Sequence, residues 1–353
     1  MLLSALCASA ASVALPDIPP GHWYEIPASS LREVASRAPV DGSVSKITAW
    51  SSAAFDPHAR RLLVWGGGHA DYSGNEVYAF DLGLLRWERL TDPSAADRER
   101  TADSYADGRP RSRHSYDYVE FLPTQNRLLS FGGAALYPYG NASTRRISEF
   151  DPEARSWVTG RRADVPAGGN MIGAHARVDA TTGDVFFVAG QRAALARYSP
   201  GDDRWRDGWG KAYVRVHATA AIDPKRRSFV LIGSGTDSPQ ALKWHLDRPG
   251  NAVDLRKLTT GDREIEKAYA PGFDFHLPSG RFVAWAGGGE VYVLDPDGWR
   301  WTRRAPAPGN ITVPAAQLST GTYGRFRYVP DLDLFVLMNG VDRNVFVYRL
   351  APL

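Results

Sequence analysis

One sequence unit recurs along the whole chain, and this repeat restricts the possible folds more than any other feature. Each unit contains an apolar strand that ends at Asp-Pro or a similar turn, an apolar run that leads into glycines, an aromatic strand and then a Trp. The first copy reads AWSSAAFDP, RRLLVWGGG, NEVYAFDL and LRWERL. Repeat units of this kind bury their apolar faces by packing against one another, so we expect one large repetitive domain.

Five more copies follow the first. The second reads HSYDYVEFLP, NRLLSFGG, RRISEFDP and RSWVTG, and the third runs from HARVDATTG through DVFFVAG and ALARYSP to DRWRDG. The fourth copy, HATAAIDPKR, RSFVLIGSG and QALKWHL, lacks the closing Trp. The fifth reads PGFDFHLPSG, RFVAWAGGG, EVYVLDPD and WRWTRR, and the sixth, YGRFRYVPD, LDLFVLMNG and RNVFVYRL, stops after its third strand.

A regular spacing between an apolar residue and the Trp supports the repeat. Six residues separate the two in four copies: Phe80 and Trp87, Phe150 and Trp157, Tyr198 and Trp205, and Leu294 and Trp301. We interpret this spacing as a β-turn between the third and fourth strands of each unit, with the Trp packed between neighbouring sheets. Four short strands per unit, repeated radially, form a β-propeller.

The sequence therefore predicts an all-β fold, a β-propeller of six blades. Eleven Trp against three Met, with 34 Gly and 24 Pro, favour short strands and tight turns over long helices. The sixth unit lacks its fourth strand, and HWYEIPAS near the N-terminus, with Trp23, supplies a spare one. We expect this strand to pair with the strand around Tyr348 and close the ring. Seven blades are the alternative if the segment Thr91–Pro110 holds strands, but its polar sequence favours a loop.

The N-terminal stretch MLLSALCASAASVAL resembles the apolar region of a signal peptide with small residues at its end. We expect residues 1–15 to be a signal peptide and residues 16–353 to form a single propeller domain, secreted or periplasmic. Cys7 is the single cysteine of the chain, so the mature protein would have no disulfide and no cysteine-ligated metal.

Charge and motifs exclude several classes of function. The formal net charge of +3 is too small to indicate a nucleic-acid partner. Beyond the N-terminal stretch, no run approaches 18 apolar residues, so we expect no membrane partner. The sequence contains no phosphate loop, dinucleotide fingerprint or serine nucleophile elbow. We expect a monomer that requires no cofactor.

The paired glycines, the following aromatic strand and the spaced Trp resemble kelch repeats, such as those in the central domain of galactose oxidase. The resemblance covers nearly the entire mature chain and implies a kelch-like propeller. The segments GGGHADY and RHSYDY are also similar to those of exported bacterial propellers, some of which are polysaccharide lyases such as the ulvan lyases. That similarity implies an enzyme acting on an acidic polysaccharide.

The starts of the innermost strands of a propeller converge on the mouth of its central channel, together with the loops after the second strands. Reading those positions gives a set of polar and aromatic residues that we expect to face one cavity. The predicted catalytic residues are His114, His217, Tyr269, Tyr323 and His175. The predicted substrate-binding residues are His69, Tyr72, Arg113, Asn170, Arg215, Arg325 and Trp50.

These residue types favour β-elimination on a uronate-containing acidic polysaccharide. Removal of the proton next to a carboxylate creates a dianionic enolate, which a bidentate arginine such as Arg215, Arg113 or Arg325 could hold. A histidine, His114 or His217, would be the base, and a tyrosine, Tyr269 or Tyr323, would return a proton to the leaving oxygen.

Three alternatives stay open from the sequence. A glycoside hydrolase needs two carboxylates a fixed distance apart, and the mouth offers few, among them Asp71. A non-catalytic kelch module would bind glycan or protein on the same face. A divalent metal is a further option, because His69, Asp71 and His114 could form a partial site, although no HxH or HExxH spacing supports it.

Overall fold

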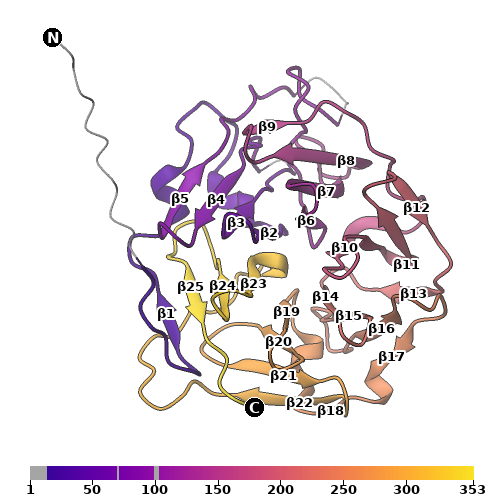
Figure 1. Cartoon of the computed structure of the whole chain (residues 1–353). Helices are drawn as coiled ribbons and strands as arrows, with labels where there is room; N and C mark the ends of the chain where they lie inside the picture. The colour runs from indigo at the N-terminus through magenta and orange to yellow at the C-terminus, as the bar shows by residue number, and fades with distance from the viewer. Residues whose placement is uncertain (1–13, 70, 99–102) are drawn as a thin grey trace.

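The computed structural model describes residues 14–69, 71–98 and 103–353. Six sheets stand around a central axis as the blades of a propeller (Figure 1). This confirms the predicted all-β fold and the number of blades. The predicted signal peptide lies almost entirely outside the described residues. In the part of the chain that the structure describes, no helix is long and apolar enough to cross a membrane.

Each blade is a sheet of short antiparallel strands in chain order. Blade 1 contains β2 (Ala53–Asp56), β3 (Arg61–Val64), β4 (Tyr78–Asp81) and β5 (Arg86–Arg89). Blade 2 contains β6 (Val119–Leu122), β7 (Arg127–Ala134), β8 (Ser143–Asp151) and β9 (Ser156–Trp157). Blade 3 contains β10 (Asn170–Val178), β11 (Val185–Ser199) and β12 (Arg204–Arg206), and β13 (Lys211–Val214) pairs with β11.

The other three blades complete the ring. Blade 4 contains β14 (Thr219–Asp223), β15 (Ser228–Ile232), β16 (Ala241–His245) and β17 (Val253–Asp254). Blade 5 contains β19 (Gly272–His276), β20 (Arg281–Trp285), β21 (Val291–Asp295) and β22 (Arg300–Arg304), and β18 (Thr260–Gly261) adds a parallel strand at its outer edge. Blade 6 contains β23 (Phe326–Val329), β24 (Leu334–Leu337), β25 (Phe346–Tyr348) and β1 (Trp23–Glu25).

Five short 3₁₀ helices lie in the described connections: η1 (Leu31–Val34), η2 (Val44–Thr48), η3 (Leu255–Lys257), η4 (Arg263–Lys267) and η5 (Tyr323–Arg325). In the described part of the segment from Thr91 to Pro110 there is no strand, only an isolated bridge between Ser104 and Pro110. This agrees with the interpretation of that segment as a loop.

The N-terminal strand closes the ring as predicted. Trp23 of β1 lies opposite Tyr348 of β25, with ring centroids 4.7 Å apart. The Trp23 indole N–H donates to the carbonyl of Gly289 in blade 5 at 2.7 Å. This closure pairs an edge of the last sheet that would otherwise stay open.

The spaced Trp residues have the positions that the sequence spacing predicted. Trp87, Trp157, Trp205 and Trp301 lie directly opposite Phe80, Phe150, Tyr198 and Leu294 on the neighbouring third strands. Trp157 of blade 2 also contacts Trp65 of blade 1, with ring centroids 5.0 Å apart. Large aromatic surfaces therefore fill the wedge between adjacent sheets.

The innermost strands β2, β6, β10, β14, β19 and β23 contact one another in order around the axis. Their starts lie at one mouth of the channel and their ends at the other. This arrangement places residues from distant parts of the sequence around each mouth.

Candidate functional site: a histidine cavity at one channel mouth

A cavity of 360 Å³ opens where the innermost strands begin. It is lined by residues from blades 1 to 5, namely Trp50, His69, His114, Tyr116, Ala135, Gly140, Asn141, Ile172, Val216, His217 and Tyr269. Among these described residues there is no Asp, Glu, Lys or Arg. The cavity is therefore polar through imidazole, phenol, indole and amide groups rather than through charge.

The backbone around this mouth adopts conformations that side chains other than glycine rarely accept. Trp50, His69, Tyr116 and Ala135 have φ angles of 46°, 54°, 35° and 51°. Trp50 and Tyr116 come three residues before β2 and β6, and the amide of Tyr116 donates to the carbonyl of Trp50 at 2.7 Å. Left-handed backbone of this kind costs energy and is concentrated at functional sites, so the packing here holds side chains over the channel.

The run of glycines before His69 brings its ring to the cavity. A Cβ on Gly68, which has a φ of 85°, would lie 2.4 Å from the Cα of Arg113 and 2.5 Å from the carbonyl oxygen of Ala135. Only glycine permits this close approach. The amide of His69 then donates to the carbonyl of Ala135 at 2.5 Å, and the His69 ring stacks parallel to the His114 ring at 5.8 Å.

His114 is fixed by its backbone and has no hydrogen bond on its ring within the described residues. Its amide donates to the carbonyl of Ala134 at 2.9 Å, and its own carbonyl accepts from the hydroxyl of Tyr118 at 2.6 Å. The ring lies against Trp50 at 4.9 Å and is only 4 % exposed. Burial, with a smaller contribution from the neighbouring His69, lowers the pKa of His114 to about 4. The imidazole is therefore neutral at pH 7.

The opposite wall is a chain of three aromatic side chains around His217. Its ring stacks on Tyr269 at 3.8 Å, and the Trp50 indole N–H donates to the Tyr269 hydroxyl at 2.7 Å. The Nδ1 of His217 lies 3.3 Å from the hydroxyl of Tyr323, which is fully buried. Burial lowers the pKa of His217 to about 4 and raises the pKa of Tyr323 well above its ordinary value.

These contacts assign the tautomer of His217. The Tyr323 hydroxyl stays protonated, and Nδ1 of His217 is the only acceptor within its reach among the described residues. A buried hydroxyl without an acceptor is costly, so Tyr323 donates to Nδ1 and the ring proton of His217 lies on Nε2. In this tautomer His217 presents an N–H donor to the cavity.

Two of the predicted catalytic residues do not line the cavity. His175 is completely buried in the channel, where its Nδ1 lies 3.0 Å from a carboxylate oxygen of Asp117. Tyr323 is fully buried and contacts two lining residues, with its hydroxyl 3.3 Å from Nδ1 of His217 and its ring 6.0 Å from that of Tyr116. His69, His114, His217, Tyr269 and Trp50 do line it.

The predicted arginine clamp is absent from this cavity. Arg113 is buried and donates to the carbonyls of Arg111 and Asp103, and Arg325 is buried and donates to those of Ser51 and Met338. Burial lowers the pKa of each guanidinium to about 10. These side chains bind backbone and hold loops together. The position of Arg113 beside His114 in the sequence did not reveal that its guanidinium turns toward backbone carbonyls.

The other predicted binding residues also lie elsewhere. Arg215 lies over the ring of Tyr213 at 5.9 Å, Asn170 accepts from the amide of Ile172 at 2.9 Å, and neither lines the cavity. Tyr72 is buried beneath the loop, with its hydroxyl donating to Glu76 at 2.6 Å.

Tyr116 and Asn141 line the cavity but were not predicted from the sequence. Tyr116 belongs to the RHSYDY segment and occupies the same position of the repeat as Trp50, three residues before the inner strand, and this equivalence is a signal that could have found it. Asn141 lies in the loop after β7, which is the counterpart in blade 2 of the loop after β3 that carries His69, and this equivalence could also have found it.

The suggested metal trio does not form. Among the described residues, no group of three His, Cys, Asp or Glu side chains is arranged to hold a metal ion. The ring of His69 faces His114, while Asp71 lies 3.9 Å from the ammonium of Lys46.

Fold and site together define a six-bladed β-propeller with a neutral, histidine-rich cavity at one channel mouth. The chain is similar in structure to a gluconolactonase from Xanthomonas campestris, with a TM-score of 0.53 and 12 % sequence identity over 95 % of this chain and 97 % of that one. This likeness supports the propeller fold. No family model matches the sequence, and no curated protein matches it either.

The prediction of a polysaccharide lyase is wrong. A solved propeller that the chain resembles is a gluconolactonase, which is a hydrolase rather than a lyase. Among the described residues that line the cavity there is also no guanidinium to hold a uronate carboxylate. The similarity to ulvan lyases drawn from GGGHADY and RHSYDY is not confirmed by the comparisons, and in this structure the two segments bring the rings of His69 and His114 together.

Proposed function

We propose that the protein is a hydrolase that opens a neutral cyclic ester, a sugar lactone, in the histidine cavity. The observation that carries this proposal is the set of three imidazoles and two tyrosine hydroxyls around one cavity whose described lining contains no charged residue. Ester hydrolysis needs a base and an oxyanion donor, both of which neutral imidazole and phenol groups supply. The fold that the chain shares with a gluconolactonase adds support.

His114 is the base of the proposed reaction. Its ring nitrogens have no hydrogen-bond partner in the described structure, and with a pKa of about 4 the ring is unprotonated at neutral pH. A water between His114 and the substrate transfers a proton to the imidazole as its oxygen attacks the lactone carbonyl carbon. The His69 ring stacked on His114 restricts the orientation of the base.

Tyr269 and His217 stabilise the negative charge on the carbonyl oxygen. The Tyr269 hydroxyl already accepts from Trp50, so its own proton is free to donate, and His217 offers Nε2–H beside it. When the tetrahedral intermediate collapses, the ring C–O bond breaks and the protonated His114 returns its proton to the leaving oxygen. The product is the open hydroxy acid, with water consumed.

The substrate is neutral and contains a ring. An anion would find no cationic side chain in the lining, and a cation no carboxylate. The indole of Trp50 and the phenol of Tyr269 offer faces against which the C–H surface of a sugar ring can pack. Asn141 and Tyr116 also line the cavity and offer polar groups that can bond the hydroxyls of such a ring.

Hydrolysis of gluconolactone, followed by continuous titration of the acid released, tests the proposal. His114→Gln should lower kcat by about 10²- to 10⁴-fold, the usual contribution of a general base. His22→Gln is the matched control, because His22 lies outside the cavity with its ring bonded to the carbonyl of Pro20, and it should leave the rate unchanged. The reasoning fails if no lactone is hydrolysed above the uncatalysed rate, or if His114→Gln is fully active.

We further propose that the repeat is of the kelch type, that the protein is exported to the periplasm or the medium, and that it works as a monomer without a cofactor. The glycines at the ends of the second strands and the Trp opposite the third strands support the kelch type.

A further inference from the structure

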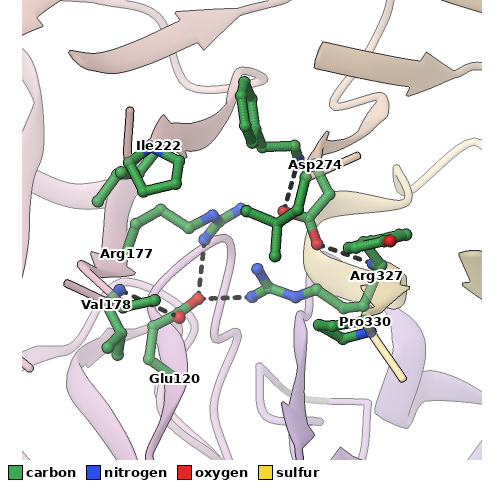
Figure 2. Close-up of a pocket in the computed structure, with 12 residues that line it drawn as sticks. Glu120, Arg177, Val178, Ile222, Asp274, Arg327 and Pro330 are labelled. Atoms are coloured by element: carbon green, nitrogen blue, oxygen red, sulfur yellow. Dashed lines mark hydrogen bonds and ion pairs between the residues drawn. The ribbon is translucent and has the colours of Figure 1, made fainter. Parts of the chain in front are cut away.

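A second cavity, of 170 Å³, lies at the opposite mouth of the channel, where the innermost strands end (Figure 2). Blades 2 to 6 each contribute residues to it, among them Glu120, Arg177, Ile222, Asp274 and Arg327. It shares no lining residue with the histidine cavity. The proposed reaction does not use this second cavity.

The guanidinium of Arg327 has hydrogen-bonding capacity left over at this cavity. Its Nε donates to the carbonyls of Ala53 and Gly324, and its Nη2 donates to Glu120 at 2.5 Å. No partner for Nη1 is found among the described residues, although the side chain is only 6 % exposed and lines the cavity. A buried guanidinium with two N–H groups that have no acceptor in the described structure indicates a ligand that accepts hydrogen bonds.

Asp274 brings complementary acceptors. Its carboxylate accepts from the amides of Phe275 at 2.8 Å and Tyr328 at 2.9 Å, and no ion pair with an Arg or Lys is found for it in the part of the chain described. Two of about four lone-pair positions on its oxygens therefore stay open. Figure 2 shows this carboxylate on the side of the cavity next to Arg327.

The remaining charges are paired with one another. Glu120 lies between the guanidiniums of Arg177 and Arg327 and accepts from both, as Figure 2 shows. Arg177 also donates to Asp117 at 2.5 Å. The carboxylates of Glu120 and Asp274 disfavour an anion, while the two guanidiniums disfavour a cation. Free donors and free acceptors at a site of mixed charge suit a neutral ligand that both donates and accepts.

We propose that this cavity binds a neutral polyol, either a single sugar ring or a shorter chain of hydroxyl groups. Each hydroxyl is a donor and an acceptor, so one can accept from Arg327 and an adjacent one can donate to Asp274. Phe275, Leu277 and Ile222 supply apolar walls for the C–H surface of such a ligand. The volume accommodates one ring rather than an oligosaccharide.

Isothermal titration with glucose and glycerol tests the site, with inorganic phosphate and methylammonium as the charged comparisons. Leu277→Trp should block the cavity, because Leu277 lines it and is 49 % exposed, without touching the ion pairs. Leu258→Trp is the matched control, since Leu258 is 48 % exposed and does not line the cavity. We expect polyol affinity to fall at least about tenfold, 1.4 kcal/mol, in the first variant and to stay unchanged in the second.

A second variant, Asp274→Asn, and a second measurement, lactone hydrolysis, complete the test. Asp274→Asn, which keeps the shape but loses the charge, should also weaken polyol binding by about tenfold. Hydrolysis of lactone by Leu277→Trp should be unchanged, so a failure of the proposed reaction and a failure of this site are distinguishable. The proposal is overturned if no polyol binds the wild-type protein, if Leu277→Trp binds it as tightly as the control, or if phosphate or methylammonium binds better.

Discussion

The ion pairs of Glu120 across the channel give the sharpest prediction about stability. Glu120 of blade 2 accepts from Arg177 of blade 3 at 3.1 Å and from Arg327 of blade 6 at 2.5 Å. All three side chains are buried. In Glu120→Ala, Arg177 keeps Asp117 as a partner, but Arg327 is left as a buried cation without any carboxylate bonded to it.

Removing one partner of a buried ion pair typically costs about 3–5 kcal/mol, because the charge that remains has lost both water and its counter-ion. The unfolding entropy of a chain of 353 residues converts this loss into a fall in Tm of about 4–7 °C. Glu120→Gln should fall between the wild type and the alanine variant, because the amide oxygen still accepts one hydrogen bond but carries no charge.

Thermal unfolding followed by circular dichroism measures these differences, with urea unfolding as a second estimate. Glu153→Ala is the control, because Glu153 is exposed on a turn of blade 2, and its Tm should stay within about 1 °C. A fall of less than about 1 °C for Glu120→Ala would show that the blades are held by packing alone and that these ion pairs add nothing.

Two substitutions and the pH dependence of stability give further expected outcomes. Trp23→Ala should cost about 3–5 kcal/mol in urea unfolding because Trp23 is buried against Tyr348 at the ring closure, and a loss below about 1 kcal/mol would contradict that closure. Burial lowers the pKa of His175, so the unfolded chain binds a proton that the native protein does not bind. The free energy of unfolding should therefore decline as pH falls below about 6.5. Asp117, whose pKa Arg177 lowers against the effect of burial, should add a further loss below about pH 4. Urea midpoints that do not fall between pH 7 and pH 5 would refute the effect of His175, and midpoints that do not fall further below pH 4 would refute that of Asp117. Gly68→Ala should abolish the proposed lactone hydrolysis and lower Tm, because its Cβ would collide with Arg113, and an active, equally stable variant would contradict the close approach.

The repeat in the sequence was sufficient to predict the ring. Alternation of apolar residues, the turns at Asp-Pro and the spacing of Phe80 to Trp87 are local features, and strand pairing within one blade is also local. The missing fourth strand of the last unit could be assigned to the segment around Trp23 because an unpaired sheet edge is costly. The turns, the Trp spacing and the ring closure depend on residues close in sequence or on the number of strands, and the sequence alone gives both.

The site was only partly predictable, for a different reason. The repeat pattern brought His69, His114 and His217 to one mouth, because the symmetry of the ring places there both the starts of the inner strands, near His114 and His217, and the loop after the second strand, which carries His69. The same symmetry could not show which way a side chain points. Arg113 and His114 are adjacent in sequence, yet one guanidinium turns inward to backbone carbonyls while the neighbouring ring faces the cavity.

Charge compensation in the channel was decided by tertiary structure alone. Asp117, Glu120, Arg177 and Arg327 lie on three different blades, and nothing in the sequence relates them. The tautomer of His217 likewise depends on Tyr323, which is 106 positions away. Sequence by itself determined the number and order of the blades, because these follow from local periodicity. Tertiary structure decided which polar groups are used up in mutual hydrogen bonds and which remain free to meet a ligand, because burial and pairing arise only when distant strands come together.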